Sequence, residues 1–221
     1  MKNPTRSGAV VCFMGIDGSG KSTLAQALYH ELQSQGIQCT YLWWLQAEDS
    51  LLRRILRKVL TKKGPAHPQV SPKQWLISGS GKQQSAYQMC VLLDYLRQLV
   101  TRVIVPARFG KTVICDRYIY DTVIAFAVEF GYSERRFNRV LEIVESISPR
   151  PDVLFIVDVP IEIAFSRKDD IVDSDALRTP KMKYLEMSKR MSACVLDGTR
   201  DLESLSRDVL SEVEKHLERR K

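Results

Sequence analysis

Short apolar runs alternate along the chain with longer segments in which apolar residues recur at helical spacing. Residues 9–14 (Ala-Val-Val-Cys-Phe-Met) are apolar throughout, which is typical of a strand buried on both faces of a parallel sheet. Further strands are predicted at 37–44, 112–115, 152–157 and 193–196. Strands that alternate with helices predict an α/β fold, here a five-stranded parallel sheet with helices on both faces.

Helices are predicted at 21–35, 85–105, 119–130, 133–147 and 181–192, with a short one that reaches about residue 168 and a last one from about residue 201. Gly36 stands where a helix-ending glycine is common, and Pro106 is expected to end the long helix 85–105. The apolar stripe of that helix serves either the core or an interface with a second copy of the chain. The length favours one domain over residues 1–221.

Three segments stand apart from this alternation. Residues 51–63 are predicted to form an amphipathic basic helix. Three roles stay open for its charged face: exposure to solvent, contact with an anionic membrane, or contact with acceptor phosphates. Residues 64–84 carry three prolines, three glycines and several serines, which predicts a mobile loop or a small insertion. Residues 169–180 are polar and acidic and end in proline, so they are interpreted as a loop.

The turn after the first strand carries a phosphate-loop pattern. Residues 15–22 (Gly-Ile-Asp-Gly-Ser-Gly-Lys-Ser) match GxxxxGK[ST] at every fixed position, between a predicted strand and a predicted helix. Glycines let backbone amides curl around an anion, and the start of a helix adds positive charge there. Lys21 is expected on the β- and γ-phosphates and Ser22 on Mg²⁺. The residues expected to bind ATP here are Gly15, Asp17, Gly18, Ser19, Gly20, Lys21, Ser22 and Thr23.

A second Gly-Ser-Gly-Lys occurs at residues 79–82. Leu76 occupies the place of the first glycine, Gln83 follows the lysine, and no clear strand precedes the segment. We therefore interpret it as loop composition and not as a phosphate site.

Two charged residues follow the buried strand 112–115. Asp116 is placed to hold Mg²⁺ beside the phosphate loop, directly or through water. Arg117 comes next, and a guanidinium at this edge of the sheet can bind a phosphate through two hydrogen bonds. The alternative is an ordinary surface ion pair.

On these motifs the chain resembles the thymidylate kinase family of nucleoside monophosphate kinases. The resemblance rests on residues 13–23, 110–118 and 151–160 and on Arg167. It implies ATP-dependent phosphoryl transfer to a nucleoside monophosphate, foremost dTMP to dTDP, with ATP and Mg²⁺ as cofactors. It also implies small-molecule nucleotide substrates and a homodimer as partners.

The resemblance assigns roles to matching residues. It implies that Asp17 contacts the sugar hydroxyl of the acceptor and that residues 167–182 form a lid over ATP. The turn that contains Thr199 resembles the place that holds adenine. The catalytic residues implied are Lys21, Asp116, Arg117 and Arg167, and the metal ligands implied are Ser22 and Asp116.

The departures from the family fall on the acceptor side. Residues 43–46 (Trp-Trp-Leu-Gln) replace an Arg-Glu-Pro segment, and Val91 and Tyr95 stand where the family has a phenylalanine and an arginine. Asp121 replaces a serine or asparagine. Two alternatives therefore stay open, a kinase of another nucleotide, nucleoside or small metabolite, and an ATP-binding regulator without transfer. Four aromatic residues either stack on a base or pack in the core: Trp43, Trp44, Tyr95 and Tyr118.

Composition narrows the class of protein only a little. Hydrophobic residues make up 44% and charged residues 27% of 221 residues, which argues against wholesale disorder, a collagen-like fibre and a coiled-coil rod. The net charge of +7 suits phosphate-bearing ligands. The basic residues are spread along the chain without a recognition module, so no nucleic-acid partner is expected.

A cytoplasmic location is expected from two observations. No run approaches the roughly 18 apolar residues of a membrane helix, and the short polar start does not resemble a signal peptide. The cysteines show no CxxC spacing, which predicts free thiols in a reducing compartment. They are Cys12, Cys39, Cys90, Cys115 and Cys194.

Overall fold

The computed structural model describes residues 8–43, 80–167 and 173–219. The predictions for the basic helix 51–63, for residues 64–79 and for Trp44 lie outside the described residues. None of the helices in the described part is long and apolar enough to cross a membrane.

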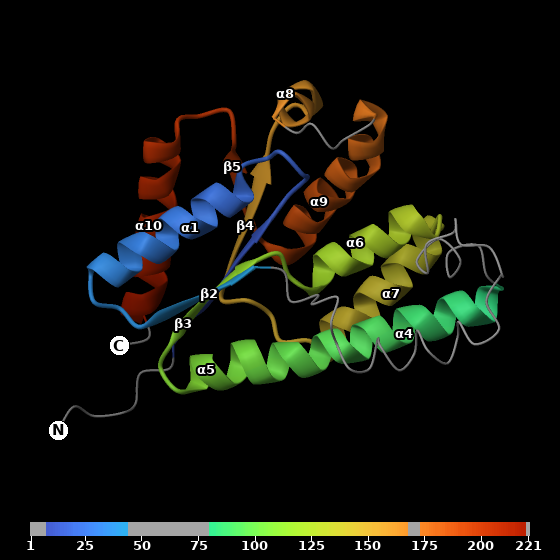
Figure 1. Ribbon diagram of the computed structural model, residues 1–221, viewed down its shortest axis with the longest axis horizontal. Helices are drawn as coiled ribbons and strands as arrows, with labels where there is room; N and C mark the ends of the chain where they lie inside the picture. The colour runs from blue at the N-terminus through green and yellow to red at the C-terminus, as the bar shows by residue number, and fades with distance from the viewer. Residues whose placement is uncertain (1–7, 44–79, 168–172, 220–221) are drawn as a thin grey trace, which may run out of the picture.

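Five parallel strands form one sheet in the order β2-β3-β1-β4-β5. This confirms the predicted fold class, and each strand lies within about two residues of its predicted position. The loop that follows β1 therefore emerges at the middle of the sheet edge, beside the ends of β3 and β4 (Figure 1). The strands are β1 Val10–Met14, β2 Cys39–Trp43, β3 Thr112–Asp116, β4 Val153–Asp158 and β5 Cys194–Asp197.

Helices cover both faces of the sheet. Helices α1 and α10 lie on one side, and α4 to α7 and α9 lie on the other (Figure 1). In chain order the helices are α1 Lys21–Ser34, α4 Gly81–Gln98, the π-helical η1 Leu99–Ile104, α5 Val105–Arg108, α6 Ile119–Glu129, α7 Glu134–Ile147, α8 Ile161–Ser166, the 3₁₀-helical η2 Ser174–Leu177, α9 Arg178–Met191 and α10 Leu202–Arg219.

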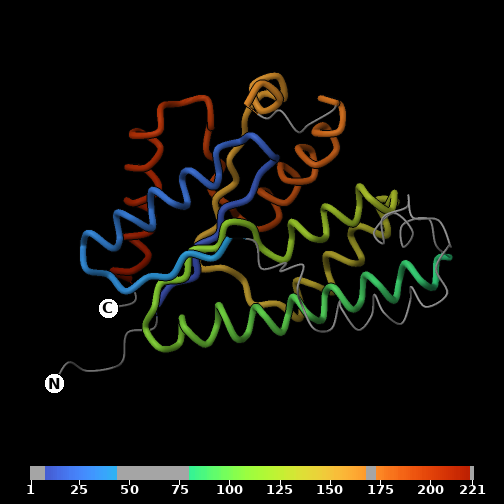
Figure 2. The backbone as a smooth tube through the Cα atoms, in the orientation of Figure 1, coloured from blue at the N-terminus to red at the C-terminus, as the bar shows by residue number. Residues whose placement is uncertain are grey.

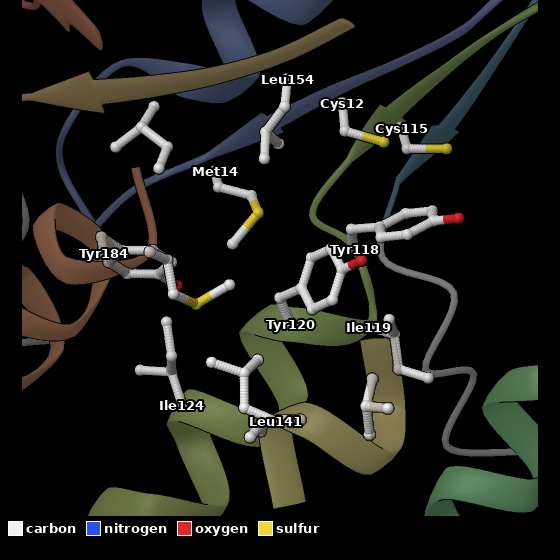
Figure 3. Packing of buried hydrophobic residues seen from close by; sticks show 14 of the residues in the cluster. Cys12, Met14, Cys115, Tyr118, Ile119, Tyr120, Ile124, Leu141, Leu154 and Tyr184 are labelled. Carbon is white, nitrogen blue, oxygen red and sulfur yellow. The ribbon is translucent and has the colours of Figure 1, made fainter. Parts of the chain in front are cut away.

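Alternate side chains of β1 enter the two halves of the core. Val11 and Phe13 point toward α1 and α10, and the Phe13 ring stacks on Phe155 with centroids 5.1 Å apart. Cys12 and Met14 point to the other face, where they pack with Tyr118 and its neighbours (Figure 3). An all-apolar run is therefore needed, because a strand at the centre of the sheet has no solvent-facing side.

The long helix does not end at Pro106, contrary to the sequence prediction. The helical path continues from α4 through η1 to Arg108, as the unbroken tube in Figure 2 shows. Proline lacks an amide hydrogen and normally breaks a helix interior. Here Pro106 lies in the first turn of α5, directly after the wider π-helical turn, where a proline removes no needed donor. The helix ends instead at Arg108, and Gly110, with a φ of 86°, lies in the turn just beyond it.

The same helix begins earlier than predicted, so residues 81–84 are helical and not part of a loop. Ser80 caps it, and its backbone amide donates to Oε1 of Gln83 at 3.0 Å. The described part of the second Gly-Ser-Gly-Lys is therefore the start of a helix, where Ser80 and Gln83 form a capping box.

The loop predicted at 169–180 is only partly described, since residues 168–172 lie outside the described residues, and most of its described part is helical. Residues 174–177 form η2, and α9 starts at Arg178. Asp173 stabilises this start, because its Oδ1 accepts the amide of Asp175 at 2.9 Å. Residues 173–182 of the lid predicted at 167–182 are thus largely helical.

Candidate active site

The loop between β1 and α1 has the curled shape that the motif predicts. Gly15, Gly18 and Gly20 have φ values of 144°, 81° and 92°, and the amide of Ser19 turns back to the carbonyl of Ile16 at 3.2 Å. Leu24 is the first residue of α1 whose amide bonds to a backbone carbonyl, that of Gly20 at 3.1 Å. The amides just before it therefore have no carbonyl in the helix to bind, which makes this end of α1 an anion-binding position.

Lys21 folds back over the loop. Its Nζ donates to the carbonyl of Ile16 at 3.1 Å and to Oδ1 of Asp17 at 3.3 Å. Burial lowers the pKa of Lys21, and the charge of Arg117 lowers it further, against the opposing effect of nearby aspartates. A cation in this position can meet a phosphate group held by the loop amides.

Asp116 ends β3 in the interior, beside the loop. Its Oδ2 accepts the hydroxyl of Tyr41 at 3.0 Å, and its Oδ1 is buried with no hydrogen-bond partner in the structure. Burial and the negative charge of Asp116 raise the pKa of Tyr41 to about 12. An unpartnered buried carboxylate oxygen is a suitable ligand for a divalent cation. Ser22, the predicted second ligand, lies in the first turn of α1.

The residues that the structure describes contain no cluster of three or more His, Cys, Asp or Glu side chains that could hold a metal ion alone. A site made of Ser22 and Asp116 fits a different arrangement, in which phosphate oxygens and water complete the coordination of Mg²⁺. The predicted pair is therefore compatible with a nucleotide-bound ion.

Arg117 connects the end of β3 to the loop after β1. Its guanidinium donates a hydrogen bond to Oδ1 of Asp17, the same oxygen that accepts the hydrogen bond from Nζ of Lys21. Burial tends to raise the pKa of Asp17, but the positive charges of Arg117 and Lys21 outweigh it and lower that pKa below its ordinary value. The backbone of Arg117 has a φ of 84°, in the left-handed region that a side chain rarely adopts.

A cavity of about 280 Å³ opens beside the loop. Arg167 borders it, and its guanidinium lies 3.4 Å from the carbonyl of Gly18 and 3.5 Å from that of Gly198. Gly198 has no room for a side chain, because a β-carbon there would lie 2.6 Å from Cγ1 of Val159. The residues that line the cavity are Ser19, Gly20, Thr23, Leu24, Arg167, Gly198, Arg200, Leu202 and Leu205.

The structure adds residues that sequence reasoning missed. Arg200, Leu202 and Leu205 line the cavity, whereas the predicted Thr199 gives its amide and hydroxyl to Oδ1 of Asp197 at 3.0 and 2.6 Å. The signal available in the sequence was the apolar face of the last helix close after the Asp-Gly-Thr turn.

The predicted acceptor-side aromatics separate into two groups. Tyr95 and Tyr118 are only 2% and 1% exposed and belong to the core. Trp43 is 69% exposed at the end of β2, in register with Asp116 on β3. Of these three, Trp43 alone is accessible to a base at the strand ends.

Comparisons with known proteins give the family. A model of the thymidylate kinase family matches residues 13–209. A probable thymidylate kinase of Pyrococcus abyssi is 28% identical over 95% of this chain and 98% of its own length. A thymidylate kinase of Thermosipho africanus is 28% identical over 94% and 98%, and a probable thymidylate kinase of Methanocaldococcus jannaschii is 27% identical over 86% and 87%. The chain belongs to the thymidylate kinase family and is a phosphotransferase of the nucleoside monophosphate kinase class.

Proposed function

We propose that this chain transfers the γ-phosphoryl group of ATP to the phosphate of dTMP and forms dTDP. The observation that carries the proposal is the curled loop at residues 15–22, with Lys21 folded over it and Arg117 hydrogen-bonded at its edge. The names of the relatives support dTMP as the acceptor.

On the donor side, the loop amides and Lys21 bind the β- and γ-phosphates of ATP. Adenine occupies the cavity, where Leu202 and Leu205 offer apolar contact and Arg167 and Arg200 also line the wall. Arg200 is held in place by Asp208, 2.7 Å from its Nη1. The donor site thus combines a charged phosphate end with a more apolar base end.

The hydroxyl of Ser22 and Oδ1 of Asp116 hold Mg²⁺ in this proposal. When bound, the ion neutralises part of the phosphate charge that develops during transfer. Tyr41 supports the site by occupying the second oxygen of Asp116, which leaves Oδ1 available for the ion.

On the acceptor side, Arg117 binds the acceptor phosphate and Asp17 accepts a sugar hydroxyl. The two side chains are hydrogen-bonded to each other, so the groups that meet the sugar and the phosphate are held at neighbouring points. Transfer needs little covalent chemistry from the protein, because alignment of the two phosphates and neutralisation of their charge supply most of the rate. Lys21, Arg117 and Arg167 provide that positive charge.

A different nucleoside monophosphate is the second candidate acceptor. Val91 and Tyr95 occupy the places where the family resemblance implies contacts to thymine and phosphate, yet both are buried in the core. An acceptor held mainly by Arg117, Asp17 and the exposed Trp43 is less constrained at its base.

ADP release from ATP in the presence of Mg²⁺ tests the proposal. The purified chain is assayed with dTMP, dUMP, UMP, CMP, AMP, GMP and the corresponding nucleosides. Turnover that is fastest with dTMP supports it, turnover with another monophosphate supports the second candidate, and ATP binding without acceptor-dependent turnover makes the chain a regulator.

We also propose a homodimer in the cytoplasm. Met89, Leu93 and Val100 lie about half exposed along α4 and η1, which provides apolar surface for a second copy. All five cysteines are free, as is usual in reducing compartments. Sedimentation of the chain and of its Leu93→Glu variant tests the dimer, because a charge in a buried interface should yield monomers while leaving the fold intact.

A further inference from the structure

Arg117 lies between two carboxylates. Besides its hydrogen bond to Asp17, its Nη1 lies 3.7 Å from Oδ1 of Asp121. The side chain of Asp17 is 52% exposed, whereas that of Asp121 is only 6% exposed. Asp121 therefore contacts the guanidinium from the protein interior, and Asp17 contacts it near the surface.

Each carboxylate oxygen of Asp121 accepts one hydrogen bond. Its Oδ2 accepts the amide of Tyr118 at 2.8 Å, and its Oδ1 accepts the hydroxyl of Tyr184 at 2.7 Å. Tyr184 belongs to α9 and is 5% exposed. Hydrogen bonds thus join Asp121 to α9 and to the start of α6, an ion pair at 3.7 Å joins Asp121 to Arg117, and a hydrogen bond joins Arg117 to Asp17 in the phosphate loop.

Capping alone does not account for this carboxylate. The amide of Tyr118 needs an acceptor at the start of α6, but in a capping box the neutral side chain of a glutamine can serve at the position of Asp121. A buried carboxylate is costly unless it is paired, and burial raises the pKa of Asp121, against the charge of Arg117 and the donors that lower it. The carboxylate is therefore explained by the cation that it faces.

The backbone of Arg117 makes outside support necessary. Its φ of 84° is unfavourable for a residue with a β-carbon, and such conformations persist only where the surroundings hold them. The amide of Arg117 bonds to the carbonyl of Phe13 at 3.0 Å, which anchors the backbone to β1. The side chain is fixed separately, by the carboxylates on each side of it.

We propose that Asp121 and Tyr184 are positioning residues that hold the Arg117 guanidinium in the direction needed for the acceptor phosphate. This inference rests on the proposed function, since it assumes that Arg117 binds that phosphate. Tyr184 acts through Asp121, and Asp121 acts through Arg117; neither touches the substrate.

The first test uses Tyr184→Phe, which removes one hydroxyl and keeps the ring in the core. We expect kcat/KM for the acceptor to fall about fivefold, while the KM for ATP stays within twofold. Tyr132→Phe is the matched control, because its hydroxyl donates at 2.7 Å to Gln88, outside this set of contacts; it should leave both values unchanged. Equal losses for ATP and acceptor, or a loss in the control as large as in Tyr184→Phe, would overturn the proposal.

The second test is a double-mutant cycle between Asp121 and Arg117. Asp121→Asn should lower acceptor kcat/KM about tenfold in the unaltered chain but less than twofold in an Arg117→Lys background, because lysine cannot bridge two carboxylates with a planar fork. Equal losses in both backgrounds would assign Asp121 a purely structural role. If Asp121→Asn does not fold, the Tyr184→Phe result decides alone.

The two proposals fail in different ways. If the unaltered chain turns over no nucleoside monophosphate, the proposed function is wrong and the positioning role falls with it. If the unaltered chain is active and Tyr184→Phe leaves the acceptor kinetics unchanged, only the positioning role is wrong.

Discussion

Gly18 lies so close to Ala164 that a β-carbon on Gly18 would stand 2.2 Å from the carbonyl oxygen of Ala164. Ala164 belongs to α8, so this contact seats the phosphate loop against the helix that follows β4. The φ of 81° at Gly18 is a second constraint in favour of glycine. The shape of the loop therefore depends on a contact with a residue far away in the sequence.

Gly18→Ala should damage both the loop and its ligand. The methyl group would push the backbone of α8 or the loop aside, so we expect ATP affinity to fall at least tenfold, about 1.4 kcal/mol. Calorimetric titration with ATP measures this. Gly36→Ala is the control, since Gly36 also has a positive φ of 73° but no atom lies within 4 Å of an added β-carbon. It should lower the melting temperature and leave ATP affinity within twofold; similar affinity losses in both variants would contradict the packing argument.

Lys21→Ala should reduce acceptor-dependent ADP release by at least a hundredfold, because a positive charge next to the transferred group is removed. Lys82→Ala, in the second Gly-Ser-Gly-Lys, is the matched control: Lys82 lies exposed in the first turn of α4. It should retain activity within twofold. Residual activity of Lys21→Ala within about tenfold, roughly 1.4 kcal/mol, would show that the loop is not the phosphate site.

Arg117→Ala and Arg200→Ala should affect opposite substrates. We expect Arg117→Ala to raise the KM for the acceptor and lower kcat, with a small effect on ATP binding. Arg200→Ala should raise the KM for ATP, because Arg200 lines the cavity proposed to hold adenine. Steady-state kinetics with each substrate varied in turn measure both effects. The same pattern in the two variants would mean that the donor and acceptor sites are assigned wrongly.

Asp17 should make stability depend on pH. Its pKa is lower in the folded chain than its ordinary value, because Arg117 and Lys21 outweigh the effect of burial. Its contribution to the free energy of unfolding is therefore present above the ordinary aspartate pKa of about 4 and is lost as the pH falls through the lower folded-state value.

Urea unfolding of the unaltered chain and of Asp17→Asn, each between pH 3 and pH 7, measures this contribution. The difference in unfolding free energy between the two proteins should be largest near pH 6 and should shrink toward pH 3. A difference that is constant or grows on acidification would mean that the two cations do not stabilise the carboxylate.

The centre of the sheet and the phosphate loop follow from local sequence. The apolar run in β1 and the spacing of Gly15, Gly20 and Lys21 constrain neighbouring residues, and the structure places these elements where the pattern predicts them. The position of Asp116 and Arg117 at the carboxyl end of β3 was also predictable, because the two residues come at the end of a buried apolar run.

Other features depend on residues distant in sequence. A proline normally ends a helix, but the π-helical turn before Pro106 changes which donors are needed, and residue preferences do not reveal such a turn. Tyr95 and Tyr118 carry aromatic rings of the kind that can stack on a base, and only the packing of the fold shows that both are buried. The sequence shows Asp121 only as a departure from the family, because its bond to the hydroxyl of Tyr184, 63 positions away, depends on the tertiary fold.

The left-handed backbone at Arg117 has a consequence for engineering. A residue with a β-carbon in this conformation is destabilised by roughly 1–2 kcal/mol, and glycine would relieve that strain. Glycine would, however, also remove the cation that faces the buried carboxylate of Asp121, so Arg117→Gly exchanges backbone strain for an unpaired buried charge and should not raise heat resistance. Libraries meant to yield a robust, working catalyst need this codon held constant.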